Sequence, residues 1–539
     1  MKKDSYIHGA AFHAGGMLDA KIIGAIYRIP LSNIIGAEGI GIYQLVFPVY
    51  ALLITMMGSG IPTTLSRLIA EKNTEGNLKG AKALFRNALL FFLIIGLSGA
   101  LVLILISGLL GRIQNNSAVV TGYRLIAPAI LMSTLIAAFR GWFQGNMNMK
   151  PSAISQITEQ LVKLILGLLF AKIFIKYGLQ YAVWGAIASI TVSEIVALLI
   201  IFINFLVKHG RISEGRLSEN ISRKALFKEL IAVMVPITLG GITLPLVQFI
   251  DSLLIVNLLK GAGNSILLST KMYGMLSGPV GSLINMPVVL TLAFAVSVVP
   301  VVSRSRIERD INSIRAKSGI SVKLTFVIGV PSALALFALA EPVMNVLYPK
   351  LSAYEIQLGA GLLKVSSISI LLLSIMQIYT ALLQAIDRAY TPFINMAIGG
   401  VVKIVLTVIL IRYYGIYGAA ISTIIAYISV ALLNIAEMVK WTGRNQILFK
   451  NISTILLAGV IMCLSIILIL SLIRAGSLVN LLIGTASGIF IYGIMLALLN
   501  IFTRDELKGM PMSAIFLKFR NTIRFWERAN DNGSGDGKN

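Results

Sequence analysis

Long apolar stretches dominate this chain and restrict it to very few folds. The sequence is 57% hydrophobic and only 13% charged, a balance that water-soluble domains do not have. Segment 93–110 contains no charged residue and lacks the strict alternation of membrane β-barrel strands. A transmembrane helix needs about 20 mostly apolar residues, and about fourteen such stretches predict an all-α polytopic membrane protein. They lie near residues 7–31, 39–64, 83–111, 119–145, 151–175, 180–207, 230–257, 275–302, 319–348, 359–384, 392–412, 416–439, 452–473 and 478–502.

Basic residues are concentrated in every second loop between these stretches. The chain carries 46 Lys and Arg against 22 Asp and Glu, a net charge of +24. Because Lys and Arg accumulate on the cytoplasmic side of membrane proteins, this pattern predicts that both termini are cytoplasmic. The same side chains attract anionic membrane lipids, so the charge requires no nucleic-acid partner. The basic loops hold Arg67 to Arg86, Lys208 to Lys228, Arg304 to Lys317, Lys440 to Lys450 and the segment after Arg504.

The second half of the chain repeats the first about 240 residues later. Homologous membrane lobes commonly move against each other around a site that lies between them. We therefore expect a first lobe at 1–228, a second lobe at 229–450, a helix pair at 451–502 and a cytoplasmic tail at 503–539 with a disordered end. The matched positions are Gln144 and Gln384, Pro151 and Pro392, Lys163 and Lys403, Gly185 to Ser189 and Gly418 to Ser422, and Pro62 and Pro300.

The first predicted helix contains charges that a lipid-exposed helix would not tolerate. Lys21 and Arg28 are seven residues apart, so they project from nearly the same helix face, and a charge at mid-bilayer costs at least about 2.5 kcal/mol. That face is therefore expected to line an aqueous cavity and bind an anion, with Pro30 bending or ending the helix beside it. Alternatively, Lys21 pairs with Asp19 and Arg28 extends to the membrane surface.

Two cations of the second lobe are further candidates for the anion site. Lys271 precedes a Gly- and Pro-containing segment ending at Pro279, which predicts a bent or broken helix. The alternative for Lys271 is an ordinary lysine at the membrane interface. Glu159 lies four residues before Lys163 and predicts an ion pair there, whereas Lys403 has no such neighbour and is the better candidate for contacting cargo. Pro30, Pro62, Pro279 and Pro300 are expected to be structural or hinge positions.

Two acids, Asp251 and Glu194, lie inside predicted helices and are candidates for coupling transport to Na⁺ or H⁺. A capping or ion-pairing role is the alternative for each. The sequence has no phosphate-binding Gly-rich loop, no His-Glu-x-x-His motif and only one cysteine, Cys463, so neither an ATPase nor a metal or disulfide site is expected. No residue set predicts catalysis or a bound cofactor, and we expect a transporter rather than an enzyme.

Several motifs resemble a known family. The resemblance rests on four segments: Ile35 to Tyr43, Gly60 to Glu71, Tyr273 to Pro279 and Val299 to Ser303. These segments resemble the stage V sporulation protein B relatives, in the polysaccharide-transport branch of the multidrug/oligosaccharidyl-lipid/polysaccharide flippase superfamily, which also includes MurJ-type lipid II flippases. The resemblance covers roughly residues 5–505.

The resemblance implies two six-helix lobes that form a V-shaped cavity, followed by a helix pair. It also implies flipping of undecaprenyl-diphosphate-linked cell-wall saccharides, lipid II or a related precursor, across the bacterial cytoplasmic membrane by alternating access. The functional cations of the MurJ-type first helix correspond to Lys21 and, within a residue, Arg28, and their eighth-helix arginine corresponds approximately to Lys271. Their second-helix arginine has no clear match. The alternatives are an O-antigen-type polysaccharide exporter and a drug or cation antiporter, and in each case we expect a monomer.

Overall fold

The computed structural model describes residues 3–209, 223–388, 390–443, 446–473 and 475–499. Within these ranges the regular secondary structure is helical, as the apolar stretches predict. The predicted tail at 503–539 lies outside the described residues.

Lobe one comprises α1 to α6. Its contacts run mainly between α3 and α4, between α5 and α6, and between α1 and both α4 and α5. The helices are α1 (Lys3–Gly58), α2 (Ile61–Thr74), α3 (Leu78–Ile113), α4 (Ala118–Gly145), α5 (Lys150–Phe174), the 3₁₀ turn η1 (Ile175–Tyr177) and α6 (Leu179–His209).

The chain reverses direction within α1, at Gly36. This glycine has φ 66° and ψ −177°, a backbone conformation that glycine adopts without the steric strain of a side chain. The reversal places the Arg28 guanidinium 5.5 Å from the centre of the Phe47 ring. In one straight helix Arg28 and Phe47, which are 19 residues apart in the sequence, would be separated by about 28 Å. Therefore α1 supplies the first two predicted membrane crossings, and the first arm continues through Pro30 instead of ending there.

Lobe two comprises α7 to α15 and follows the same order of crossings. Its eighth crossing runs from α8 through a π-helical segment that contains Pro279 and into α9. The predicted single stretch at 319–348 is wrong, because α10 ends at Ala338 and a short helix follows. The elements are α7 (Arg223–Gly261), α8 (Ile266–Met275), η2 (Leu276–Val280), α9 (Gly281–Ile307), α10 (Ile311–Ala338), α11 (Ala340–Leu347), α12 (Ala353–Ser366), α13 (Ile368–Ala385), α14 (Tyr390–Tyr414) and α15 (Ile416–Thr442).

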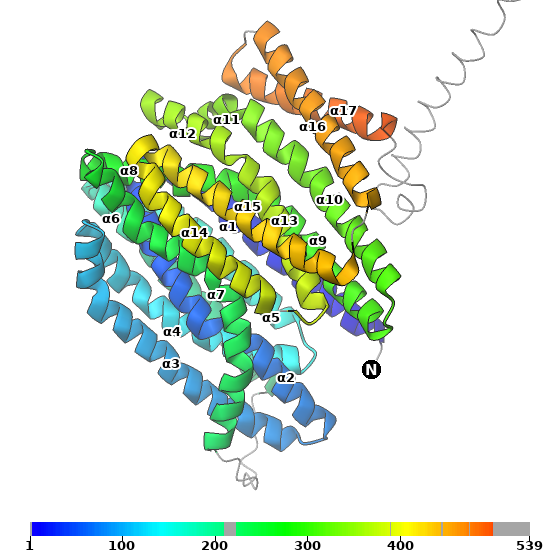
Figure 1. Ribbon diagram of the computed structural model, residues 1–539. Helices are drawn as coiled ribbons and strands as arrows, with labels where there is room; N and C mark the ends of the chain where they lie inside the picture. Colours follow the sequence, from blue (N-terminus) through cyan, green and yellow to red (C-terminus); the bar gives the residue numbers. More distant parts are fainter. Residues whose placement is uncertain (1–2, 210–222, 389, 444–445, 474, 500–539) are drawn as a thin grey trace, which may run out of the picture.

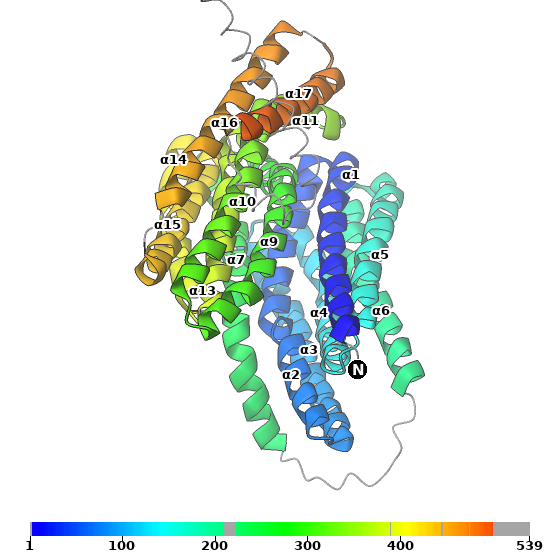
Figure 2. The ribbon, with the colours of Figure 1, turned by 90° about the vertical axis from the view of Figure 1, so that its right-hand side faces the viewer.

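The last two helices, α16 (Gln446–Leu472) and α17 (Ser477–Leu498), pack outside the two lobes. α16 lies against α10, and α17 contacts α11 and α16. Figures 1 and 2 show this pair at one corner of the molecule, where α16 runs alongside α10 and its far end extends past the other helices together with α17. Helices α12 and α13 together form the tenth crossing, with only Ser367 between them.

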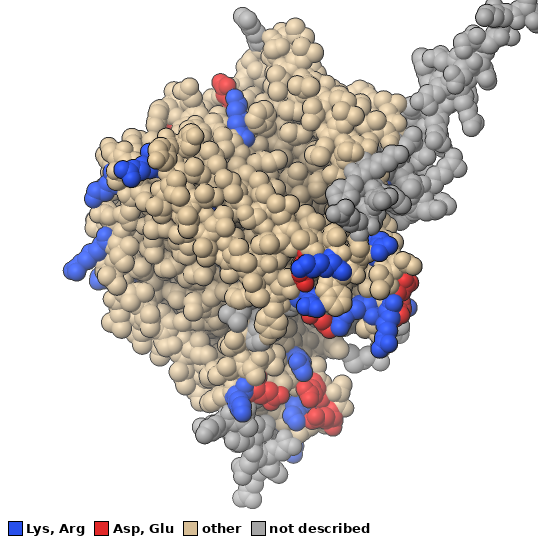
Figure 3. Space-filling model, in the orientation of Figure 1, with Lys and Arg blue, Asp and Glu red and all other residues tan. Residues whose placement is uncertain are grey.

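Twelve helical segments of the described chain are long and apolar enough to cross a membrane. The first of these, Ile26–Thr74, includes the end of the first arm of α1 and the whole second arm, and α5 is not among the twelve. When the two arms are counted separately and α5 is added, the described part has the expected fourteen crossings. Figure 3 shows a broad face without Lys, Arg, Asp or Glu, with these charges gathered at its edges.

The two ends of the bundle differ in charge. We name the end that holds the turns at 75–77, 146–149, 308–310 and 386–388 the basic end, and the end that holds Gly36 and the turns at 114–117, 262–265 and 348–352 the sparse end. In Figure 2 the basic end is below, where α2 and the start of α7 extend, and the sparse end is above, near α11. The charge difference agrees with the alternation of basic loops in the sequence.

Candidate functional site

A cavity of about 480 Å³ lies between the two lobes. Lobe one contributes α1, α4 and α5 to its wall, and lobe two contributes α7, α9 and α13. Large apolar residues such as Phe47 and Leu292 form part of the lining, and polar side chains interrupt them. The charged and amide residues of this central cavity are Arg28, Arg140, Gln156, Glu159, Gln160, Lys163, Asn285 and Gln377. The central cavity therefore contains three cations and one carboxylate among its described residues.

Arg28 extends from the first arm of α1 into the central cavity, as the sequence predicts for a cavity-lining cation. Its guanidinium lies over the Phe47 ring of the second arm, and such a contact stabilises a cation by about 0.5–2 kcal/mol. Among the described residues no carboxylate forms an ion pair with it. Arg28 also lines an adjoining cavity of about 200 Å³, so one cation faces both spaces.

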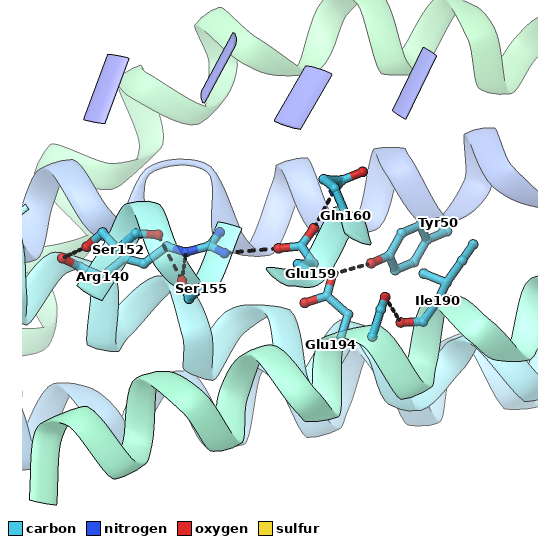
Figure 4. A network of polar contacts seen from close by, with 9 residues as sticks. Tyr50, Arg140, Ser152, Ser155, Glu159, Gln160, Ile190 and Glu194 are labelled. Carbon is cyan, nitrogen blue, oxygen red and sulfur yellow. Dashed lines mark hydrogen bonds and ion pairs between the residues drawn. The ribbon is translucent and has the colours of Figure 1, made fainter. Parts of the chain in front are cut away.

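The ion pair predicted between Glu159 and Lys163 is wrong. Glu159 accepts instead from Arg140 of α4, with an Nη2 to Oε2 distance of 2.9 Å, and from Gln160 at 2.8 Å. Ser155 holds the same arginine through its Nε at 3.1 Å, and Figure 4 shows these side chains meeting around the Glu159 carboxylate. Because this carboxylate is engaged by α4, Lys163 has no ion-pair partner in the described part of the chain. A sequence pattern along one helix could not reveal the competing arginine.

Lys403 occupies the position in lobe two that Lys163 occupies in lobe one, but its charge is neutralised. Its Nζ donates to the carboxylate of Asp251 on α7, and Lys403 is only 5% exposed. The expectation that Lys403 lacks an acidic partner is therefore wrong. The pair lies in the wall of the adjoining cavity. Here an ammonium group already contacts Asp251, the carboxylate that was a candidate for binding a coupling ion.

Lys271 lies at the sparse end, in α8. Its Nζ is 3.5 Å from a carboxylate oxygen of Glu355, which also forms a capping box with Ser352 at the start of α12. The residues that line the central and adjoining cavities do not include Lys271. This position is that of a paired lysine near the membrane surface, and its role in binding an anion stays a prediction. The structure does not join it to Arg28.

Glu194 is a buried acid of α6 in lobe one. Its Oε1 accepts a hydrogen bond of 3.0 Å from the hydroxyl of Tyr50, and the residue is 5% exposed. Figure 4 shows Tyr50 and Glu194 beside the Glu159 group. In the described residues Glu194 forms no ion pair, so it remains a candidate for proton coupling. No group of three or more His, Cys, Asp or Glu that could hold a metal ion occurs among the described residues.

The remaining predicted positions divide between described and undescribed parts. α1 passes through Lys21, but the side chain of Lys21 lies outside the described residues. Pro62 begins α2 in its first turn, where proline is well tolerated, and Pro300 lies inside α9. Their roles as hinges, like those of Pro30 and Pro279, stay predictions.

Sequence analysis did not identify Arg140 as part of the site. Its presence inside an apolar stretch at 119–145 was a signal that could have done so, because intramembrane charges usually face a cavity or a partner. The amides Asn285 and Gln377 gave no comparable signal, since such residues also occur in ordinary helix contacts. Together these residues form a polar chamber in which Arg28 and Lys163 form no ion pair with any side chain that the structure describes. Such a chamber can bind a multiply charged anion.

Residues 7–306 match the sequence pattern of the polysaccharide biosynthesis protein family. The chain belongs to this family. This family member is 26% identical to stage V sporulation protein B of Bacillus subtilis strain 168, over 95% of this chain and 99% of that protein. It is 25% identical to the lipid II flippase MurJ of the same organism, over 84% of this chain and 86% of that protein.

Solved structures confirm the predicted fold class. The lipid II flippase MurJ in an inward closed conformation superposes with a TM-score of 0.70 and 17% identity, over 90% of this chain and 98% of that one. An inward-facing multidrug resistance MATE family transporter of the MOP superfamily gives a TM-score of 0.67 and 17% identity, over 81% and 95%. The family member is thus an all-α protein with the two-lobe fold of this superfamily.

Proposed function

We propose that this protein is a flippase for undecaprenyl-diphosphate-linked cell-wall saccharides, lipid II or a related precursor, in the bacterial cytoplasmic membrane. The observation that carries the proposal is that Arg28 and Lys163 both line a cavity between the two lobes and form no ion pair with a side chain that the structure describes. A diphosphate cannot enter hydrocarbon without a large desolvation penalty. A cavity with two free cations offers its oxygens charge-assisted hydrogen bonds, while the polyprenyl tail stays in the lipid.

Alternating access explains how such a site would move its cargo. The cavity would open first to one leaflet and then to the other, and the binding energy must be similar in both states so that the head group can leave. The cationic wall belongs to lobe one, since Lys403 of lobe two is neutralised by Asp251. We therefore infer that the diphosphate binds mainly to lobe one. Lys21, on the same arm of α1 as Arg28, is proposed to extend this site.

The activity of a relative and the charge pattern of the cavity support the same cargo. The Bacillus subtilis relative at 25% identity is a lipid II flippase. An antiporter of cationic drugs is disfavoured because its cargo would meet the uncompensated charges of Arg28 and Lys163. An exporter of other lipid-linked polysaccharides would share the diphosphate and differ only in the sugars. We further propose that the basic end faces the cytoplasm, with both termini there.

Reconstituted vesicles test the proposal. Fluorescent lipid II in one leaflet should reach the other leaflet with the native protein, and Arg28→Ala and Lys163→Ala should each slow this transfer about tenfold or more. Arg304→Ala removes the same charge from an exposed residue in the last turn of α9 and should transport normally. A double variant lacking both Arg28 and Lys163 that flips at the native rate would refute the anion site. Repeating the assay with an undecaprenyl-diphosphate oligosaccharide that lacks the peptide would separate lipid II from other saccharides.

A further inference from the structure

Asn33 joins the first helix of lobe one to lobe two at the sparse end. Its Nδ2 donates to the carbonyl of Leu347 at 2.7 Å, and its Oδ1 accepts from the backbone N–H of Lys350 at 3.3 Å. The same Nδ2 also donates to the carbonyl of Ile29, one turn earlier in its own helix, at 3.2 Å. Both cross-lobe partners belong to the turn between the ninth and tenth crossings. One amide side chain thus binds its own helix and the opposite lobe together.

Asn257 makes the equivalent set of contacts from lobe two. Its Nδ2 donates to the carbonyl of Ile113 at 2.7 Å and to that of Leu253, one turn earlier, at 2.6 Å. Its Oδ1 accepts from Nδ2 of Asn115 at 2.6 Å. Ile113 and Asn115 lie at the turn between the third and fourth crossings, which corresponds in the repeat to the turn contacted by Asn33. The two asparagines therefore correspond in position and in partner loop, and each donates to one carbonyl of its own helix and to one of the opposite lobe; only the donor to the side-chain oxygen differs.

The local sequences agree with this equivalence. Each asparagine stands near the end of the first helix of its lobe, is followed by two aliphatic residues, and precedes a glycine, Gly36 or Gly261. Each asparagine donates to a carbonyl of its own helix and, at 2.7 Å, to a backbone carbonyl of the opposite lobe. Similar contacts at both pseudo-symmetric positions indicate a shared task at the boundary between the lobes.

Close backbone packing accompanies these hydrogen bonds at the same end. A Cβ added to Gly274 of α8 would collide with the carbonyl oxygen of Ala37, and one added to Gly41 would collide with that of Thr270. The second arm of α1 and α8 can approach so closely only because both glycines lack side chains. Gln44 adds a donor to the carbonyl of Ser277. The lobes are thus closed against each other along a seam at the sparse end.

We propose that Asn33 and Asn257 are paired latches of this seam, and that both must release before the central cavity can open at the sparse end. The inference rests on the proposed function, since alternating access requires one closed end to open. Hydrogen bonds suit this task because each stabilises the closed state by only a modest free energy. Both can be replaced by hydrogen bonds to water when the seam opens. Two similar latches on opposite sides of the seam can release together when one lobe rocks away from the other.

Spin-label distances test the latches without any cargo. Labels on Lys176 of lobe one and Tyr354 of lobe two, both exposed, report the separation of the lobes in a Cys463→Ser background. Asn33→Leu and Asn257→Leu keep a similar side-chain shape and remove the cross-lobe hydrogen bonds. The combined variant should move the closed-to-open ratio about tenfold toward open, and each single variant should move it by less.

Asn204→Leu is the matched control. Asn204 donates to the carbonyl of Ile200, one turn earlier, at 2.9 Å, but it lies within lobe one and away from the seam. This variant should leave the distances unchanged. Gly274→Ala widens the seam by a different route and should also favour the open state, whereas Gly493→Ala, where an added Cβ meets open space, should not. Unchanged distances in a folded combined asparagine variant would overturn the proposal, as would an equal change in Asn204→Leu.

A cross-link separates failure of the latch from failure of the proposed function. Asn115→Cys and Asn257→Cys place two thiols where the side chains are in contact, and a short reversible cross-linker should hold the seam closed. Lipid II transfer should stop on cross-linking and return on reduction. Continued transfer in the cross-linked protein would contradict the latch. If the native protein moves no polyprenyl-diphosphate lipid, the proposed function fails, while the distance measurements still decide whether the asparagines close the seam.

Discussion

The ion pair between Lys403 and Asp251 gives a quantitative test of the asymmetry between the lobes. The Lys403 side chain is only 6% exposed and that of Asp251 is 19% exposed. Replacing Asp251 by Asn leaves a buried ammonium group without its counter-charge. Removing one partner of a buried pair costs about 3–5 kcal/mol of stability, and partial exposure of Asp251 to the cavity places the expected loss near the lower limit.

A second substitution should recover most of this loss. In Asp251→Asn combined with Lys403→Met the buried charge is gone, and a neutral pair of similar volume is often as stable as the ion pair it replaces. The exposed pair of Arg304 and Glu308 supplies the control, with side chains 80% and 51% exposed. Glu308→Gln should change stability by less than about 1 kcal/mol.

The stability of each variant can be measured as an apparent melting temperature in detergent. The readout is the loss of monodisperse protein after heating. The single Asp251→Asn variant should unfold at a clearly lower temperature than the native protein, and the combined variant should lie close to it. Equal melting temperatures for Asp251→Asn and Glu308→Gln would refute the argument, because they would show that the Lys403 charge is well solvated. A combined variant no more stable than Asp251→Asn would likewise show that the buried Lys403 charge does not cause the loss.

Two further predictions concern lobe one. Arg140→Met should release Glu159 to pair with Lys163 one turn later and slow lipid II transfer about tenfold or more in the vesicle assay, whereas adding Glu159→Gln should restore it. Recovery is essential, because a persistent defect in the combined variant would show that Arg140 itself contacts cargo. Gly36→Ala should lower stability by about 1 kcal/mol, because alanine is strained at the positive φ of this position while no atom blocks the added Cβ. Gly108→Ala, in an ordinary helix and also with open space around the added Cβ, should not lower stability. Melting temperatures measure both variants.

The fold was largely predictable because its main determinant acts along the chain. A bilayer excludes unpaired backbone groups, so apolar stretches of sufficient length become helices whatever their neighbours are. The repeated positions, such as Pro62 with Pro300, then indicated two lobes. The first helix was expected to bend or end at Pro30, whereas it continues to Gly36, because both residues can interrupt a helix and only the backbone conformation distinguishes them.

The candidate site was predictable only in part. Arg28 could be assigned to the cavity because it shares a helix face with Lys21, and two cations in an apolar helix have few alternatives. Lys163 was expected to be paired and Lys403 to be unpaired, and the described part of the structure shows the reverse. The reason is that Glu159 is close to Lys163 in the sequence, whereas Asp251 is distant from Lys403. Ion pairing depends on which side chain reaches a carboxylate across a helix interface, and that geometry has no signature in the spacing along one helix.

The sequence by itself determined the number of crossings, the duplication and the charge difference between the two ends, because hydropathy and charge act locally on each segment as it meets the membrane. Tertiary structure decided which charges remain free. Lys403 pairs with Asp251 of α7, and Glu159 pairs with Arg140 of α4. Arg28 and Lys163 face the central cavity. Tertiary structure also brought Asn33 and Asn257 to the opposite lobes, since only packed helices bring together residues so far apart in the chain.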